Sequence, residues 1–212
     1  MKIIVAEDHP LFREAIQRLC VERLGHRVVA TTGSGPEAAA LAIRCRPDVM
    51  ILDLGLPGLD GFGVVRRVRA EAPTVRFLAF TSHLDPATVY LTERAGLEGF
   101  LDKEATEESR LREALVALAA GRRYFCPAYL ALRQQRLDNP RSFDKCLTDA
   151  EWRILELVGC GLDDDEIAAR LGRSAYTAQK HRSRIMAKLG IPGAAKLVAY
   201  LRRQGFGRFV EP

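Results

Sequence analysis

The stretch PDVMILD, residues 47–53, decides the fold of the first half of the chain. It is a short apolar run that ends on a carboxylate, Asp53, and such a run is typical of a buried strand in a parallel sheet. Other short apolar runs also end on polar side chains, which are Glu7, Asp8, Thr81 and Lys103. Because the carboxyl ends of parallel strands meet at one crevice, we expect all of these side chains to lie close together.

The expected cluster holds three carboxylates, from Glu7, Asp8 and Asp53. Carboxylates repel one another at short distance unless a hard cation neutralises them, and oxygen ligands with an open coordination position suit Mg²⁺. The pattern therefore predicts a Mg²⁺ site, with Asp53 as a candidate phosphoryl acceptor. Haloacid-type phosphatases also place an aspartate after a strand, but there a second aspartate follows two residues later. Leu54 and Gly55 follow Asp53 here, which disfavours that enzyme class.

Strand and helix signals alternate on both sides of this stretch. Five apolar runs are predicted as strands, near residues 3–6, 28–31, 49–54, 75–80 and 100–101. Each of them precedes a segment with helical spacing of its apolar residues, so the first half contains five βα units. Such alternation predicts an α/β fold with a doubly wound parallel sheet and helices on both of its faces.

The periodic pattern stops after Gly121, where the last of these helices ends. Residues 133–145 are polar and contain an Asp-Asn-Pro turn, which indicates a linker. We therefore expect a first domain over residues 1–122, a linker over 123–145 and a second domain over 146–212.

The second domain opens with dense helix-capping signals. Thr148 with Glu151 and Asp163 with Glu166 are predicted capping boxes, and Ser174 is a further N-cap. Glycines follow as C-caps. These signals predict an all-α domain of four short helices, the last over about residues 194–204.

Charge is distributed unevenly along the chain. Residues 1–124 hold 17 Lys/Arg and 17 Asp/Glu, whereas residues 125–212 hold 15 and 10. Within the second part, residues 174–203 carry seven cations and no acid. This is the electrostatic footprint of a protein that binds a polyanion, most simply double-stranded DNA.

The sequence contains no signal for membrane insertion or export. No apolar stretch approaches the roughly 18 residues of a membrane span. Acids at residues 7 and 8 come too early for a signal peptide. The five cysteines are odd in number and scattered, which disfavours a disulfide framework or a zinc site. We expect a cytoplasmic protein without membrane contact.

Taken in order, these residues resemble a known family. The motifs of its first domain are matched by Glu7-Asp8-His9-Pro10, Asp53-Leu54-x-Leu56-Pro57-x-x-x-Gly61, Thr81-Ser82 and Gly99-Phe100-Leu101-x-Lys103. Those of its second domain are matched by Leu147-Thr148-x-x-Glu151, Glu166-Ile167-Ala168-x-x-Leu171-Gly172, Thr177, His181-Arg182 and Lys188-Leu189-Gly190. The chain resembles a bacterial two-component response regulator of the NarL/FixJ type. The resemblance implies a flavodoxin-like (βα)₅ receiver domain followed by a LuxR-type helix-turn-helix domain.

For the receiver, the resemblance implies specific roles. Glu7, Asp8 and Asp53 would bind Mg²⁺ together with the carbonyl of Gly55. Asp53 would accept a phosphoryl group from a sensor histidine kinase, and Lys103 would balance its charge. Two further residues would act as a switch, Thr81 by hydrogen bonding to the phosphoryl group and Phe100 by repacking behind it. The chain would thus be a phosphorylation-controlled transcription factor and not an enzyme that turns over a substrate.

The helix expected over residues 175–189 has the pattern of a DNA-recognition helix. Ala178, Ile185 and Leu189 repeat at core spacing. The residues left on the exposed side are Gln179, Lys180, Ser183, Arg184 and Lys188. Gln179 suits adenine and Lys180 suits guanine in the major groove. Thr177, Arg184 and Lys188 are expected to bind phosphates.

The sequence also departs from the family pattern. The usual Val-Lys pair after the helix threonine is Ala178-Gln179 here, which removes one cation. Residues 163–165 are all aspartate, and Asp164 and Asp165 would face phosphates if they pointed outward. The alternative to a transcription factor is therefore a receiver-containing protein-interaction module with weak or no independent DNA binding.

The last expected helix has an apolar side that could form a contact between two copies of the chain. Leu197, Val198 and Leu201 share one side of it. The resemblance favours a homodimer contact at this face on phosphorylation, and the other interpretation is packing within the domain core.

Overall fold

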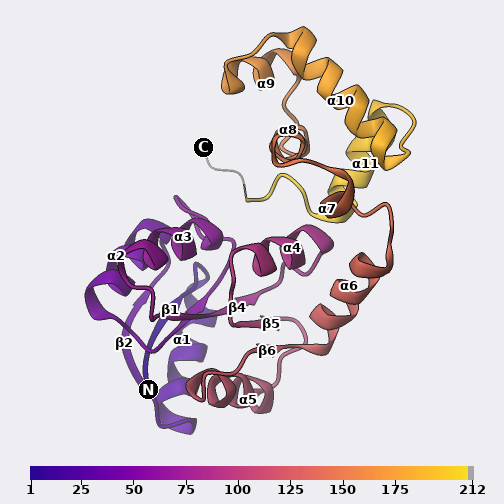
Figure 1. Ribbon diagram of the computed structural model, residues 1–212. Helices are drawn as coiled ribbons and strands as arrows, with labels where there is room; N and C mark the ends of the chain where they lie inside the picture. The colour runs from indigo at the N-terminus through magenta and orange to yellow at the C-terminus, as the bar shows by residue number, and fades with distance from the viewer. Residues whose placement is uncertain (210–212) are drawn as a thin grey trace. The chain divides into compact units, whose positions relative to one another are not determined.

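The computed structural model describes residues 1–209, which form two compact units (Figure 1). The first unit comprises residues 1–84 and 91–131, and the second comprises residues 85–90 and 132–209. No helix within the described residues is long and apolar enough to cross a membrane.

The first unit is built on a parallel sheet with the strand order β2-β1-β3-β4-β5-β6. The strands are β1 (Lys2–Ala6), β2 (Arg27–Thr32), β3 (Val49–Leu52), β4 (Arg76–Thr81), β5 (Gly99–Asp102) and β6 (Tyr124–Phe125). Every neighbouring pair is parallel. All four residues of β3 are buried, as the uninterrupted apolar run predicts for a central strand covered on both faces.

Helices cover both faces of this sheet. They are α1 (Pro10–Arg18), η1 (Leu19–Arg23), α2 (Gly35–Cys45), α3 (Gly61–Glu71), α4 (Pro86–Arg94), α5 (Glu108–Ala119) and α6 (Pro127–Asp138). Figure 1 shows α2 and α3 on one side of the sheet and α1 and α5 on the other. This arrangement confirms the predicted doubly wound α/β fold.

The sheet has one strand more than the five predicted. Tyr124 pairs with Gly99 and Phe125 with Phe100, so β6 extends the sheet beyond β5. A strand of two residues is too short to show alternation in the sequence, which is why the pattern missed it.

The segment predicted as an irregular linker is largely helical. α6 continues to Asp138, and a single turn, α7, covers Phe143–Cys146. The last turns of α6 are polar and carry a hydrogen bond from Gln134 to Asp138, 2.8 Å long. Apolar periodicity therefore stops before the helix does.

The second unit contains the four predicted helices. They are α8 (Asp149–Gly159), α9 (Asp164–Leu171), α10 (Ala175–Leu189) and α11 (Ala194–Gln204). Both predicted capping boxes are confirmed, at Thr148 with Glu151 and at Asp163 with Glu166. Gly172 ends α9 at φ +63°, a left-handed conformation that favours glycine. Arg173 alone separates Gly172 from Ser174, the N-cap of α10, which makes α9 and α10 a helix-turn-helix pair.

The face of α11 departs from the prediction of a dimer surface. Leu197 and Leu201 are fully buried, whereas Val198 is 37 % exposed. The two leucines stand four residues apart on one helical face, and that face is buried in the second unit. Of the three residues predicted to form the dimer contact, Val198 is the one that stays exposed.

Candidate metal centre and nucleic-acid interface

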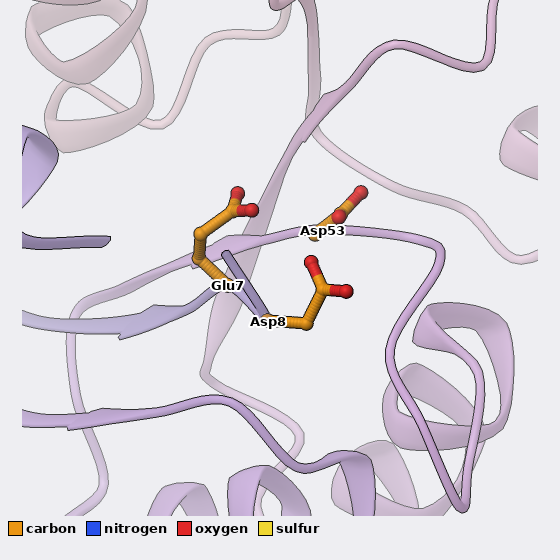
Figure 2. A group of neighbouring side chains, drawn as sticks. All are labelled: Glu7, Asp8 and Asp53. Atoms are coloured by element: carbon orange, nitrogen blue, oxygen red, sulfur yellow. The ribbon is translucent and has the colours of Figure 1, made fainter. Parts of the chain in front are cut away.

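Polar side chains from separate strand ends meet at the carboxyl edge of the sheet. Glu7 and Asp8 follow β1, and Asp53 follows β3. One carboxylate oxygen from each lies within 4.8 Å of the other two. Figure 2 shows the three carboxyl groups directed toward a common space. Glu7 and Asp53 are buried and Asp8 is exposed, so the cluster opens to solvent on the side of Asp8.

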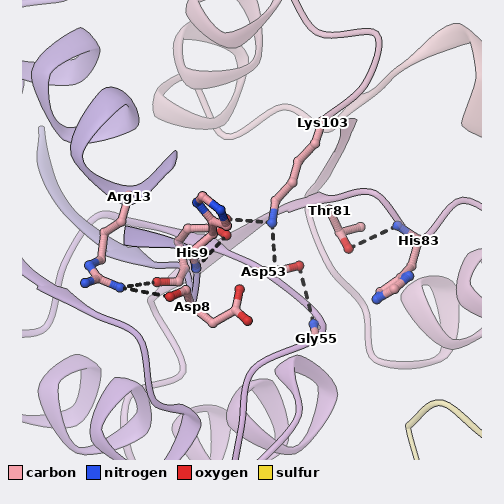
Figure 3. Close-up of polar contacts among 9 residues, drawn as sticks. Asp8, His9, Arg13, Asp53, Gly55, Thr81, His83 and Lys103 are labelled. Carbon is pink, nitrogen blue, oxygen red and sulfur yellow. Dashed lines mark hydrogen bonds and ion pairs between the residues drawn. The ribbon is translucent and has the colours of Figure 1, made fainter. Parts of the chain in front are cut away.

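Lys103 bridges two of these carboxylates. Its Nζ lies 2.6 Å from Oε2 of Glu7 and 2.8 Å from Oδ2 of Asp53 (Figure 3). Burial tends to lower the pKa of Lys103, but hydrogen bonds and charges from Asp53 and Glu7 reverse this effect, so its pKa is raised. The lysine is therefore held as a cation beside Asp53.

One cation does not neutralise three carboxylates. Burial raises the pKa of Glu7, and the hydrogen bond and charge of Lys103 offset only part of that effect. A buried group with a raised pKa is one whose negative charge is not fully compensated. The donor set, three carboxylates with one side open, fits a hard divalent cation.

The second oxygen of Asp53 is held by the backbone. The amide of Gly55 donates to Oδ1 of Asp53 over 3.3 Å. Gly61 allows the loop after β3 to pack closely, because a Cβ there would stand 2.8 Å from the carbonyl oxygen of Asp53. The structure thus brings the Gly55 amide to the acceptor. The role of the Gly55 carbonyl as a ligand stays a prediction.

Two further residues, Arg13 and His83, lie at the cluster, and of these Arg13 was not predicted from the sequence. Nη1 of Arg13 donates to the carbonyl oxygen of Glu7 over 2.6 Å and lies 3.4 Å from that of Asp8 (Figure 3). The imidazole of His83 stands over Gly55, because Nε2 would lie 3.2 Å from a Cβ at that position. No motif in the sequence marks Arg13, since its partners are backbone atoms.

The two predicted switch residues are both fully buried. Thr81 is the last residue of β4, and its Oγ1 accepts a hydrogen bond from the amide of His83 over 3.2 Å. The ring of Phe100 lies 5.0 Å from that of Tyr129 in α6, which in turn stacks on Phe125 at 4.7 Å. Phe100 is therefore already packed inward, against a helix that the sequence analysis assigned to the linker.

The helix α10 divides into a buried and an exposed face as predicted. Ala178, Ile185 and Leu189 are buried. The exposed residues include Gln179, Lys180, Ser183 and Arg184.

Three other residues of this region are engaged within the domain. Nζ of Lys188 forms an ion pair with Glu151 at 2.7 Å, and Arg182 forms one with Asp164 at 2.6 Å. The hydroxyl of Thr177 lies 2.8 Å from that of Ser174. Lys188 and Thr177 are thus less available for phosphates than the sequence predicts, and Asp164 is paired with a cation.

Comparisons with known proteins identify the family of both parts of the chain. Residues 3–116 match the response regulator receiver domain, and residues 145–201 match the bacterial regulatory proteins of the luxR family. The chain belongs to the luxR-type response regulators.

Relatives match this response regulator over nearly its whole length. The nitrate/nitrite response regulator protein homolog of Haemophilus influenzae is 32 % identical, with 90 % of this chain and 91 % of that protein covered. The probable transcriptional regulatory protein NarL of Mycobacterium tuberculosis is 32 % identical, with 96 % and 94 % covered. Among solved structures, RcsB of Salmonella enterica serovar Typhimurium, bound to promoter rprA in the presence of the phosphomimetic BeF₃⁻, aligns with a TM-score of 0.64. That alignment has 25 % identity and covers 95 % of this chain and 98 % of the other.

The geometry of this response regulator suits transfer of a phosphoryl group to a carboxylate. Asp53 offers an oxygen nucleophile. Lys103 supplies a fixed positive charge within hydrogen-bonding distance of Asp53, where charge would develop on a transferring group. The arrangement supports one covalent modification, and the family is one of DNA-binding transcription regulators and not of catalytic enzymes.

Proposed function

We propose that this response regulator accepts a phosphoryl group on Asp53 from a sensor histidine kinase, and that the modification controls its binding to double-stranded DNA. The observation that carries the proposal is the position of Lys103, whose Nζ contacts both Asp53 and Glu7 at the edge of the acidic cluster. A lysine that only formed a surface ion pair would not need to be buried between two carboxylates.

In this proposal the cluster residues have distinct roles. Glu7, Asp8 and Asp53 hold Mg²⁺, with the carbonyl of Gly55 as a further ligand. The ion, when bound, offsets the negative charge of the phosphoryl oxygens. An oxygen of Asp53 attacks phosphorus, the bond from phosphorus to the kinase imidazole breaks, and Lys103 balances the charge on the group transferred.

The signal then passes through the two buried switch residues. Thr81 lies at the end of β4, where its hydroxyl oxygen accepts from the amide of His83 and its O–H can donate to a phosphoryl oxygen. Phe100 shares the sheet with Thr81 and packs on Tyr129. A movement of Thr81 would change the space behind it. We propose that Phe100 then repacks, which changes its stack on Tyr129 in α6.

The second domain supplies the output. We propose that the exposed face of α10 enters the major groove, with Gln179 and Lys180 at base edges, Ser183 nearby and Arg184 at a phosphate. Thr177 and Lys188 are proposed phosphate contacts that must first leave their partners within the domain.

The organisation follows from these assignments. We propose a receiver over residues 1–122, a connecting segment over 123–145 and the helix-turn-helix domain over 146–212, of which residues 210–212 lie outside the described part. We also propose a homodimer on phosphorylation, because one chain carries one proposed recognition helix, α10, and paired half-sites require two. A cytoplasmic location follows from the proposed partner, bacterial DNA.

A second candidate function is a protein-interaction module that binds DNA weakly. It is favoured by one observation: Lys188 and Arg182, two cations of α10, are engaged with Glu151 and Asp164. Binding of the full chain to total genomic DNA over a series of salt concentrations separates the two candidates. A steep fall of affinity with salt is expected for the transcription factor.

The acceptor itself is tested by intact-mass measurement. With Mg²⁺ and a small phosphodonor, we expect one phosphoryl group on the wild-type chain and none on Asp53→Ala. Asp48→Ala is the matched control, because Asp48 is an exposed aspartate next to the other end of β3 and should leave labelling unchanged. Labelling of Asp53→Ala at the wild-type level would show that Asp53 is not the acceptor.

A further inference from the structure

Tyr176 is an unusually exposed aromatic residue at the start of α10. It lies in the first turn of this helix, two residues after the N-cap Ser174, and 72 % of its surface is exposed. A single exposed apolar side chain is ordinary on a protein surface, so exposure alone does not indicate a function. Its position relative to the other exposed residues of α10 is what distinguishes it.

Tyr176 continues the exposed stripe of the helix. Gln179, Lys180 and Ser183 stand three, four and seven positions after it, and residues at these spacings share one helical face. All three are exposed, while the opposite face holds the buried Ala178 and Ile185. Tyr176 is therefore the N-terminal member of the face proposed to enter DNA.

Thr177, the residue after Tyr176, is not part of this exposed face. Thr177 is partly buried, its amide donates to the Ser174 hydroxyl over 3.2 Å, and its own hydroxyl lies 2.8 Å from that hydroxyl. Thr177 thus belongs to the helix cap. In helix-turn-helix proteins the N-terminal residues of the second helix contact base edges. On α10 the exposed residue at this place is Tyr176.

The neighbours of Tyr176 along α10 suit a negatively charged partner, and the proposed DNA is one. Lys180 lies one turn away, Arg184 two turns away, and residues 174–203 contain no acid. The ring itself carries no charge. It can therefore add base preference without adding to the electrostatic part of binding, which comes from cations.

We propose that Tyr176 is a specificity-determining residue, whose ring packs against the C5-methyl group of a thymine in the major groove. Apolar contact with this methyl is a standard way of reading thymine. The inference rests on the proposed DNA binding and extends it to a residue outside the predicted set. Tyr176 contributes to which base is preferred, while Arg184 contributes to how strongly the duplex is held.

The experiment is a selection from duplexes with a randomised centre, using the full-length chain in the presence of Mg²⁺ and a small phosphodonor. The variants are Tyr176→Ala, Tyr176→Phe and, as the phosphate-contact control, Arg184→Ala. We expect the wild type and Tyr176→Phe to enrich thymine at one position in each half-site, and Tyr176→Ala to lose that preference. Replacing this thymine by uracil, which lacks only the methyl, should weaken wild-type binding about fourfold, the equivalent of one buried methyl. The same replacement should leave the DNA affinity of Tyr176→Ala unchanged.

The salt dependence separates this inference from the function on which it rests. Arg184→Ala, which removes a proposed phosphate contact, should reduce the slope of log K against log salt by about 0.9, and Tyr176→Ala should leave it unchanged. If the wild type enriches duplexes and Tyr176→Ala keeps the same thymine preference, the role of Tyr176 is wrong while DNA binding stands. If the wild type enriches no duplex and its binding is independent of salt, DNA binding itself fails and the role of Tyr176 fails with it.

Discussion

At the scale of single residues, Asp53 is held by two groups of different kind. Lys103 contacts Oδ2 and the Gly55 amide contacts Oδ1. Gly55 has no side chain, and a Cβ there would lie 3.9 Å from Oδ2 of Asp53 and 3.2 Å from the imidazole of His83. We therefore expect Gly55 and His83 to flank the path by which water reaches a phosphorylated Asp53.

Substitution at Gly55 is expected to change the lifetime of the phosphoaspartate. In Gly55→Ala the added methyl covers part of that path, so hydrolysis should slow severalfold. In His83→Ala the path widens and a polar neighbour is lost, so the lifetime should change without loss of phosphorylation. The decay of the labelled protein after removal of the phosphodonor measures both.

Ala119→Ser, at an exposed position of α5, is the control for a one-atom addition outside the cluster, and its decay should equal that of the wild type. Unchanged half-lives in both Gly55→Ala and His83→Ala would show that neither residue flanks the attacking water.

At the scale of elements, the first turn of α9 contains three aspartates that differ in their contacts. Asp163 is the N-cap, Asp164 forms the ion pair with Arg182, and Asp165 is exposed. The first helix of a helix-turn-helix crosses the DNA backbone, which places its exposed acids near phosphates. Asp165 is thus the acid of this turn expected to oppose binding.

Asp165→Lys is expected to strengthen nonspecific DNA binding. It removes a repulsion and adds one possible phosphate contact, so the slope of log K against log salt should steepen by about 0.9. Reversing an acid at a helix N-terminus should also cost a few tenths to about 1 kcal/mol of stability. Affinity over several salt concentrations, measured beside a thermal melt, gives both quantities.

Asp149→Lys is the control, because Asp149 is an exposed acid in the first turn of α8 and carries the same helix-dipole effect. A lowered melting temperature with an unchanged slope in Asp165→Lys would place Asp165 away from the phosphates.

The stack of α6 on β5 gives a second prediction at this scale. Tyr129 is 1 % exposed and contacts both Phe100 and Phe125. Tyr129→Ala should therefore lower the free energy of unfolding by about 3–5 kcal/mol, the usual cost of emptying a large aromatic site. Chemical denaturation of the full chain measures it, with Leu130→Ala as a control, because Leu130 is 47 % exposed on the same helix. Equal losses in the two variants would contradict a special role of the stack.

The elements also show why some features were predictable and others were not. The strands β1, β3 and β4 are apolar runs in the sequence, and the acidic cluster followed from the ends of such runs. Strand β6 and the stacking of Tyr129 depend on contacts between segments distant in sequence, which single-sequence patterns do not report. The ion pair of Lys188 with Glu151 was not predicted for the same reason, because the two residues are 37 positions apart in the sequence.

At the scale of the whole molecule, the two halves of the chain differ in charge. The first half is balanced, and the net charge of +5 comes from the second. Phosphorylation would add negative charge at the acidic edge of the sheet in the first unit, while the output surface lies on the basic helix α10 of the second. Signal and output therefore depend on separate groups within one chain.

Assembly is expected to follow phosphorylation. Val198 is the residue of the predicted dimer face that stays exposed, so Val198→Asp should weaken dimerisation of the phosphorylated chain. Sedimentation at DNA-binding concentrations measures the dimer fraction. Val116→Asp changes an exposed valine of α5 and serves as the control. A dimer weakened only by Val116→Asp would move the contact from α11 to the receiver.

The central claim is that phosphorylation of Asp53 controls DNA binding. Its most direct test is the affinity of the full-length chain for genomic DNA fragments at one fixed salt concentration, with and without Mg²⁺ and a small phosphodonor, for the wild type and Asp53→Ala. We predict that the phosphodonor tightens binding of the wild type and leaves Asp53→Ala unchanged. Equal tightening of both proteins, or none in a wild type shown by mass to be phosphorylated, would contradict the claim.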